Sequence, residues 1–531
     1  IECWCNWHTG ITHYFVTPTK SRATCAKSRR DRAQTPCMTT MGPLGAYNAT
    51  VPQMASFAAS AHVARNDSHH YHVPFRSQYD RLGENRASEA IEVHWLPKNA
   101  SHDHASSSDI FRNLGQISPY QPADDLFPET AKHQAIPEQC RLVQAHLLHR
   151  HGARYPTHGS DKGPGRFGAR LAKANGTFQA SGDLAFLGNW TYGLGCADLV
   201  NYGAKGMFDA GSHDYYDYAG LLDHKLLVRT TTQNRMLESA RYWALGFFGW
   251  DAPNRMHFQV IDEAEHKNNT LSPKYACKNA HEKRFKLGDD LSASWRAVFL
   301  PPIAARLQSH VQGFEFSLDD VFDMMSACAY ETVALGTSEF CRLFTKAEWE
   351  NFEYAKDLEV QGSDGFMGPM ARALGVGWVT EFLYRLEQKP FAGPFTSQNA
   401  TLVTNSKHFP VHDKLYVDFS HDRVMTSILT ALNMTQIGDT LDPKRPDPNR
   451  RYRASRVTPF GARFAFEVID CGDESPWIRA KINEAIVPLN QHQGCTKPRP
   501  DGLCPLTQFV QHVRHAIESI DFDRACNEYD S

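Results

Sequence analysis

The sequence predicts an α/β fold in which helices flank a sheet and a smaller all-α domain is inserted. Two observations lead to this prediction. Short apolar segments typical of strands alternate with segments of helical periodicity, and the middle of the chain holds several helical segments in succession. The chain of 531 residues is also longer than most single domains. We therefore expect an α/β core with helical insertions at roughly 160–215 and 265–360.

Four short segments have the pattern of strands. Residues 140–150 (CRLVQAHLLHR) form an apolar run that ends at a glycine-containing turn, and residues 414–422 (KLYVDFSHD) alternate apolar and polar side chains. Residues 463–471 (RFAFEVIDC) are predicted as a further strand, and residues 226–228 as a short strand that ends directly before Arg229. These segments supply the predicted sheet.

Helices are predicted between these strands. In residues 233–249 apolar side chains recur at three- and four-residue intervals, which is typical of an amphipathic helix. Residues 317–335 and 375–388 are predicted as helices too. Residues 294–311 are expected to form a helix that the pair Pro301–Pro302 interrupts, because proline cannot donate the helical hydrogen bond.

The first hundred residues differ from the rest of the chain. Residues 1–105 are rich in Ser, Thr, Ala, His, Arg and Asn and lack sustained periodicity. We predict a poorly ordered, low-complexity N-terminal extension there and a folded domain over residues 106–531.

The composition argues against two classes of partner and favours one location. Lys and Arg total 56 against 59 Asp and Glu, a net charge of −3, so no basic excess is available for nucleic acid. No apolar stretch reaches the ~18–20 residues that a membrane span needs. The 13 cysteines and eight N-glycosylation sequons favour a soluble, secreted protein with N-linked glycans. The sequons are at Asn48, Asn66, Asn99, Asn175, Asn189, Asn268, Asn399 and Asn433.

Charged side chains follow three of the predicted strands. Arg150, His151 and Arg154 lie at the end of the strand predicted at 140–150, and Arg229 directly follows the strand at 226–228. His421 and Asp422 lie at the end of the strand predicted at 414–422. Because ligands of open α/β sheets bind beyond the carboxyl ends of strands, we expect these side chains to share one pocket. Crowded cations are stable when an anion lies among them, and the arginine fork matches phosphate oxygens. The pattern therefore predicts a phosphate site.

The residue types suggest a role for each group. His151 is the candidate nucleophile, because an imidazole held at one ring nitrogen by a backbone carbonyl can attack with the other. Gly152 would let the backbone bend beside the ligand. Asp422 is the only carboxylate beside the cluster in sequence, and in its protonated form it could donate to a leaving oxygen. Taken alone, Asp422 could equally be a helix N-cap.

The same residues resemble a known family. RHGARYP (residues 150–156), the HD of DFSHD, and stretches such as IDEAEHKNNTLSP and TPFGARFAFEVIDC resemble the histidine acid phosphatases, within them the fungal phytase branch of the phosphoglycerate-mutase-like superfamily. The resemblance runs from about residue 107 to the C-terminus. It implies a phosphoglycerate-mutase-like sheet flanked by helices. It also implies a phosphohistidine at His151, a proton donor at Asp422, and phosphate ligands at Arg150, Arg154, Arg229 and His421.

The resemblance further implies four disulfides and no metal or other cofactor. The pairs would be Cys140–Cys471, Cys277–Cys526, Cys328–Cys341 and Cys495–Cys504. The pairing of Cys3, Cys5, Cys25, Cys37 and Cys196 is left open.

The resemblance implies a phosphomonoester substrate, whose identity stays open between phytate, as in a 3-phytase, and simpler esters. Efficient phytases of the family ring the pocket with lysines, whereas this chain has only Lys162 and Arg166 after RHGARYP. Glu263 and Glu331 lie in stretches that line the family's pocket and would oppose a highly anionic substrate. Two alternatives remain: a phosphotransferase of the phosphoglycerate-mutase type, and a non-catalytic phosphate-binding homologue.

Overall fold

A computed structural model describes residues 110–157, 160–282 and 287–528. The predicted N-terminal extension, with Cys3, Cys5, Cys25 and Cys37, lies outside the described residues, as does the predicted domain boundary near residue 105.

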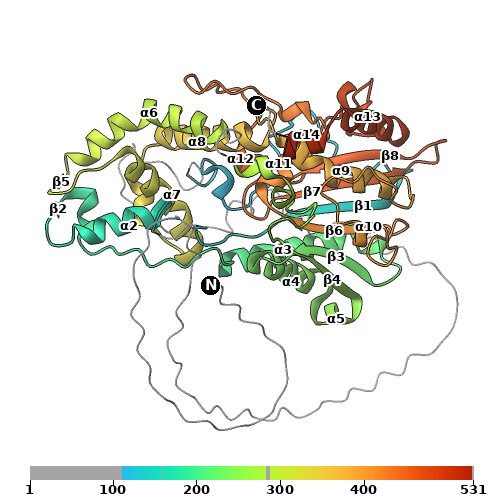
Figure 1. The fold of residues 1–531 in the computed structure, drawn as a ribbon, viewed down its shortest axis with the longest axis horizontal. Coiled ribbons are helices and arrows are strands. Elements are labelled where there is room, and N and C mark those ends of the chain that lie inside the picture. The colour runs from blue at the N-terminus through green and yellow to red at the C-terminus, as the bar shows by residue number, and fades with distance from the viewer. Residues whose placement is uncertain (1–109, 158–159, 283–286, 529–531) are drawn as a thin grey trace, which may run out of the picture. The chain divides into compact units, whose positions relative to one another are not determined.

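A mixed sheet with the strand order β10-β8-β7-β1-β6-β3-β4 forms the centre of the described part of the chain, and β9 pairs with β8 (Figure 1). The strands are β1 (Arg141–Arg150), β3 (Leu226–Thr231), β4 (Met256–Ile261), β6 (Leu415–Ser420), β7 (Arg463–Asp470), β8 (Trp477–Ile482), β9 (Ala485–Ile486) and β10 (Cys504–Pro505). Strands β1, β6, β3 and β4 are parallel, whereas β7, β8 and β10 are antiparallel. The predicted α/β fold is confirmed.

The register of the parallel strands determines which side chains meet at their carboxyl ends. Arg150, the last residue of β1, lies opposite Ser420, the last residue of β6. The next residues along the two strands, His151 and His421, therefore leave the sheet side by side. Strand β3 continues to Thr231, three residues beyond its predicted end, so Arg229 lies inside the sheet, opposite Asp418.

Helices connect and cover the strands. The longer ones are α2 (Gly163–Lys173), α3 (Asn201–Tyr218), α4 (Asn234–Phe248), α6 (Leu287–Gln308), α7 (Leu318–Leu335), α8 (Lys346–Asp364), α9 (Ala371–Leu386), α11 (Asp422–Ala431) and α13 (Leu506–Glu518). The short ones are α5 (Ala252–Arg255), α10 (Ala400–Val403), α12 (Ala454–Val457) and α14 (Phe522–Asn527).

The two faces of the sheet have separate apolar cores. On one face, Trp243 and Phe247 of α4 pack with Leu147 and Val417 of the sheet. On the other, α9 and α11 cover the sheet, and their buried side chains belong to a larger core that includes Leu148. Figure 1 shows α3 and α4 on the side of the sheet away from α9. The neighbouring side chains Leu147 and Leu148 of β1 thus point into different cores, as expected for a strand that is buried on both faces.

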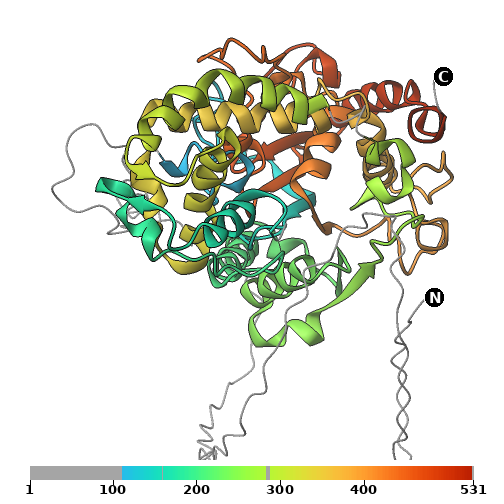
Figure 2. The same cartoon turned by 60° about the vertical axis from the view of Figure 1, so that its left-hand side comes forward.

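The predicted insertions contain helices and a small sheet. Helices α2, α6, α7 and α8 lie within them, and α6 runs beside α8 (Figures 1 and 2). Strands β2 (Gln179–Ala180) and β5 (Val311–Gln312) pair there, so the inserted region is not purely helical. The expected break at Pro301–Pro302 is wrong: α6 continues through both prolines, which are exposed. Buried side chains on both sides of the pair, such as Phe299 and Ile303, hold the helix in the core.

Four disulfides are present among the described residues, two of them between distant parts of the chain. They are Cys140–Cys471, Cys277–Cys526, Cys328–Cys341 and Cys495–Cys504, the pairs that the resemblance implied. The first joins the residue before β1 to the residue after β7. It therefore links the ends of two adjacent strands whose cysteines are 331 residues apart in the sequence. Among the described residues, no helix is both long enough and apolar enough to span a membrane.

Candidate active site

Two connections at one edge of the sheet supply the residues at the centre of the site. The chain leaves β1 at His151, leaves β6 at His421, and enters helix α11 at Asp422. The ring centroids of His151 and His421 are 5.7 Å apart, and Nη2 of Arg150 lies 3.2 Å from Oδ2 of Asp422. The structure thus brings together residues that lie about 270 positions apart in the sequence, as the strand-end pattern predicted.

The imidazole of His151 is held in one tautomer. Its Nδ1 atom lies 2.9 Å from the carbonyl oxygen of Gly152. Because a carbonyl oxygen only accepts, Nδ1 carries the proton and Nε2 keeps its lone pair. Burial, followed by the charges of Arg150 and Arg235, lowers the pKa of His151 well below its usual value. A buried, neutral imidazole with a free Nε2 lone pair can act as a nucleophile.

Close packing explains the glycine after His151. A Cβ atom on Gly152 would lie 2.5 Å from the carbonyl oxygen of Gly203 in helix α3. The amide of Gly152 donates to Oγ of Ser239 at 3.0 Å. Any larger residue would push the loop that carries His151 away from α3.

Three arginines surround this imidazole. The guanidinium of Arg150 donates to the carbonyl oxygens of Gln116 and Thr458, and it lies 4.6 Å from the centre of the Phe460 ring. The guanidinium of Arg154 lies 5.7 Å from the centre of the same ring. The buried Nε atoms of Arg150, Arg154 and Arg235 have no hydrogen-bond partner among the residues that the structure describes. Buried charged donors without partners are costly, which indicates a site for an anion.

Sequence reasoning missed Arg235, the second residue of helix α4. Its charge is among those that lower the pKa of His151. Burial and the neighbouring charge of Arg154 lower the pKa of Arg235 itself to about 10, with Glu263 and Asp422 opposing the shift. The sequence could have indicated Arg235, because this residue comes shortly after the run of β-branched threonines that extends β3.

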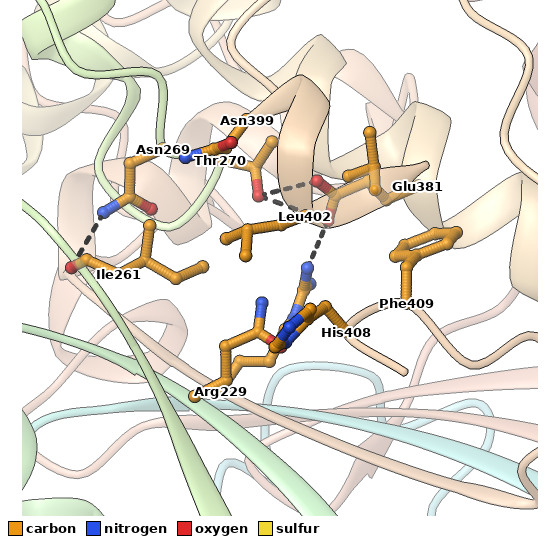
Figure 3. Close-up of a pocket in the computed structure, with 11 residues that line it drawn as sticks. Arg229, Ile261, Asn269, Thr270, Glu381, Asn399, Leu402, His408 and Phe409 are labelled. Atoms are coloured by element: carbon orange, nitrogen blue, oxygen red, sulfur yellow. Dashed lines mark hydrogen bonds and ion pairs between the residues drawn. The ribbon is translucent and has the colours of Figure 1, made fainter. Parts of the chain in front are cut away.

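The structure contradicts the prediction that Arg229 holds phosphate. Its Nε atom donates to Oδ1 of Asp418 at 2.7 Å, and its Nη1 atom donates to Oε2 of Glu381 at 2.5 Å. Figure 3 shows the guanidinium pointing toward Glu381, with Thr270 donating to the same carboxylate. The strand continues past Arg229, so this side chain forms a buried ion pair inside the fold.

A carboxylate orients the second histidine. Oε1 of Glu263 lies 2.9 Å from Nε2 of His421. Oε2 of Glu263 also accepts from Gln233 at 2.6 Å and from Ser272 at 2.9 Å. Burial alone would raise the pKa of Glu263, but His421 and the hydrogen bonds lower it to about 2. Glu263 was predicted as a residue of the substrate periphery, whereas here it lies behind His421 as an ionised partner.

Asp422 lies at the positive end of a helix. It is the first residue of α11, where the helix dipole favours a negative charge. Burial acts to raise the pKa of Asp422, but Arg150, Arg423 and Arg154 outweigh burial and lower it to about 2. An anion bound among the arginines would offset their charge and raise the proton affinity of Asp422.

The predicted periphery is only partly at the site. Arg166 is paired with Asp319 at 2.9 Å and with Asp323 at 2.8 Å. Glu331 is buried and accepts from Trp190 at 2.8 Å and from Ser338 at 2.6 Å, so it supports the helical region. Lys162 is exposed directly before α2.

A further cation was missed at the rim. Lys274 is exposed, and no carboxylate of the described residues forms an ion pair with it. Partial desolvation lowers its pKa, Glu263 opposes the shift, and the charges of Arg235 and Arg423 add to it. Lys274 is therefore close enough to the arginines for their charges to affect its pKa.

The comparisons with known proteins agree with this geometry. The model of the histidine phosphatase superfamily (branch 2) matches residues 141–483. The chain belongs to this superfamily. It is 34% identical to Phytase A of Aspergillus fumigatus over 420 residues, covering 76% of this chain and 88% of that protein. It is 33% identical to Phytase A of Aspergillus oryzae, covering 75% and 86%.

Solved structures of other proteins have the same fold as this histidine phosphatase. The crystal structure of the phytase from D. castellii matches with a TM-score of 0.67 at 24% identity, covering 82% of this chain and 93% of that chain. The family that the sequence predicted is confirmed. The matched range contains His151, Arg235 and Asp422 but excludes Gln116, whose carbonyl oxygen accepts from Arg150.

The arrangement of this histidine phosphatase site suits a tetrahedral anion. Three guanidinium groups and His421 can donate to oxygens, His151 can attack the central atom, and Asp422 is placed to exchange a proton. Among the described residues, no group of three or more His, Cys, Asp or Glu side chains is arranged to hold a metal ion.

Proposed function

We propose that this chain is a histidine acid phosphatase that hydrolyses phosphomonoesters through a phosphohistidine intermediate, with phytate among its substrates. The observation that carries the proposal is the state of His151. Its Nδ1–H is held by the Gly152 carbonyl, and its Nε2 lone pair is free among cations that can bind phosphate. The Phytase A relatives support the same activity.

In the first step, Nε2 of His151 attacks phosphorus and the bond from phosphorus to the ester oxygen breaks. The leaving oxygen takes the proton of Asp422, so an alcohol departs. The Nε donors of Arg150, Arg154 and Arg235 interact with the equatorial oxygens, where negative charge develops. These donors are already positioned in the folded protein, so little reorganisation is needed during the reaction.

In the second step, water attacks the phosphohistidine. Asp422, now ionised, takes a proton from the water, while the electron pair of the phosphorus–nitrogen bond returns to Nε2. Inorganic phosphate forms and His151 regains its lone pair. The cycle needs Asp422 protonated at the start, which favours acidic conditions because its pKa without substrate is about 2.

The proposal is tested by phosphate release from p-nitrophenyl phosphate and from phytate across pH 2.5–7. We expect His151→Ala to retain only a trace of turnover and EDTA to leave the activity unchanged. His515→Ala, which removes a histidine that is 91% exposed on α13, serves as the matched control. Substantial activity in His151→Ala, or loss of activity in EDTA, would contradict the mechanism.

The same assay separates the two alternatives. A phosphoglycerate-mutase-type phosphotransferase would release little phosphate without a phosphoglycerate, and a non-catalytic homologue would bind phosphate without turnover. The proposed nucleophile and acid and the three unpaired guanidinium Nε atoms occur together, which favours an enzyme over a non-catalytic homologue. The sequons and disulfides favour a secreted hydrolase over a phosphotransferase of the phosphoglycerate-mutase type.

We further infer that the protein is secreted and carries N-linked glycans. The sequons at Asn175 and Asn189 are exposed in the described part of the chain. Four disulfides fit an oxidising compartment. Mass spectrometry of the protein from its culture medium, before and after endoglycosidase treatment, tests both statements. An unglycosylated protein found only inside the cell would contradict them.

A further inference from the structure

Arg423 directly follows the candidate general acid, and two carboxylates of another helix hold it. Its Nη1 atom lies 3.0 Å from Oδ2 of Asp364, and its Nη2 atom lies 2.8 Å from Oε1 of Glu359. Both carboxylates are at the end of α8, whereas Arg423 is in the first turn of α11. The guanidinium therefore connects the helix that begins at Asp422 to a separate part of the fold.

Further contacts hold this connection in place. Oε2 of Glu359 lies 3.1 Å from Nζ of Lys356, and Oγ of Ser427 donates to the backbone carbonyl of Asp364 at 3.2 Å. The side chain of Asp364 is only 11% exposed and that of Glu359 20% exposed. Charges in such a half-buried setting are less screened than those of a surface pair.

We propose that Arg423, held by Asp364 and Glu359, is a positioning residue that sets how readily Asp422 takes up and releases its proton. This inference rests on the proposed function, in which Asp422 is the general acid. Arg423 acts through Asp422 and needs no contact with the substrate.

The charges around Asp422 give the direction of the effect. After burial, which raises the pKa of Asp422, the charge of Arg150 and then that of Arg423 lower it. Burial raises the pKa of Asp364 to about 6, with Arg423 opposing and Asp422 adding to the shift. When Asp364 ionises, its negative charge offsets Arg423 and helps Asp422 keep a proton.

Other ionisable groups lie near these residues and also affect their pKa values. They are Arg154, His421 and Arg235 near Asp422; Lys274 and Tyr452 near Asp364; Asp289 near Arg423; and Lys356 and Arg296 near Glu359.

Arg423→Gln tests the inference most directly. Loss of the positive charge should raise the proton affinity of Asp422 and move the upper limb of the kcat–pH profile to higher pH by about half a unit, or about threefold in rate above the limb. The effect should be larger for glycerol 2-phosphate, whose alkoxide needs a proton to leave, than for p-nitrophenyl phosphate. Arg423→Lys keeps the charge and should keep the limb in place.

Asp364→Asn supplies a second signature with its own pH range. In the parent, Asp364 ionises as pH rises through about 6. The variant should match the parent well below that pH and lose turnover of glycerol 2-phosphate above it. Asp183→Asn, which removes a carboxylate paired with Arg342 at 2.7 Å in another part of the fold, is the matched control and should leave the profile unchanged.

The possible outcomes distinguish a failure of this inference from a failure of the proposed phosphatase function. If Arg423→Gln and Asp364→Asn scale kcat equally at all pH values, their role is structural and the inference is wrong. If Arg423→Gln does not fold, as judged by circular dichroism, the pH range of the Asp364→Asn effect decides alone. If Asp422→Asn retains full turnover of glycerol 2-phosphate, or the parent has none, the proposed function itself fails.

Discussion

Glu263 and His421 form a buried pair in which Oε1 of the carboxylate lies 2.9 Å from Nε2 of the imidazole. A carboxylate only accepts, so Nε2 of His421 carries a proton directed at Glu263. For His421 also to donate to a phosphate through Nδ1, the ring must be an imidazolium. Burial lowers the pKa of His421, whereas Glu263 raises it. Glu263 thus favours the charged form that phosphate binding requires.

The first prediction concerns this pair. Glu263→Gln removes the charge that stabilises the imidazolium, so we expect KM for p-nitrophenyl phosphate to rise about tenfold near pH 5, with a smaller change in kcat. The KM–pH profile checks this, because the rise in KM should shrink at lower pH, where His421 becomes protonated without help. Asp262→Asn removes the neighbouring exposed carboxylate and should change neither constant. An unchanged KM in Glu263→Gln would refute the role.

A second prediction follows from the unpaired Nε atom of Arg235. Arg235→Gln removes a charge-assisted donor, worth about 1.5–3 kcal/mol, so kcat/KM should fall about 10- to 150-fold. The melting temperature should stay within a few degrees of the parent value or rise, because repulsion among the cations is relieved. Steady-state kinetics with calorimetry measures both. A large loss of stability with kcat/KM intact would contradict the assignment.

The third prediction is the reverse pattern at Arg229. Arg229→Gln leaves Asp418 and Glu381 buried without their ionic partner, which costs about 3–5 kcal/mol of unfolding free energy. Denaturant unfolding measures the loss. In any fraction that remains folded, active-site titration should show a turnover per folded molecule close to that of the parent.

The contrast between these two arginines shows where sequence reasoning succeeded and where it failed. His151 directly follows β1 and His421 directly follows β6, so these residues lie at the strand ends where the sequence placed them. Arg229 was misplaced because a short apolar run hid the true end of β3. The threonines at 230–232 are β-branched and could have extended the predicted strand.

Other features depend on long-range packing, which periodicity does not encode. Helix α6 passes through Pro301–Pro302 because side chains before and after the pair are buried in the core. The link from Arg423 to Asp364 joins residues of two helices that are 59 positions apart. No local pattern marks such a pair, so the structure was needed to find it.

The fourth prediction concerns the lower pH limb. The pKa of His151 lies well below its usual value because of burial and the arginine charges. A lowered pKa keeps the imidazole neutral as pH falls, so the acid limb of kcat/KM should lie well below pH 6.5. Rate measurements in buffers from pH 2.5 upward check this. A midpoint near 6.5 would mean that His151 titrates as an ordinary exposed histidine.

The last prediction addresses substrate preference at Lys274. In the proposed mechanism Arg150, Arg154 and Arg235 bind the phosphate that reacts, and a substrate with several phosphates also needs cations at the rim. Lys274 is exposed to solvent, and the charges of Arg235 and Arg423 add to the lowering of its pKa, so we expect its ammonium to contact a second phosphate of such a substrate.

We therefore expect Lys274→Ala to raise KM for phytate about three- to tenfold while changing KM for p-nitrophenyl phosphate less than twofold, since a surface charge contact is worth about 1 kcal/mol. Lys278→Ala, which removes an exposed lysine four residues further along the chain, is the matched control. The selectivity should vanish in about 1 M salt, because screening removes attraction between exposed charges. Equal changes for both substrates would show that Lys274 acts on the reacting phosphate or on the fold, and that phytate gains nothing specific from this rim.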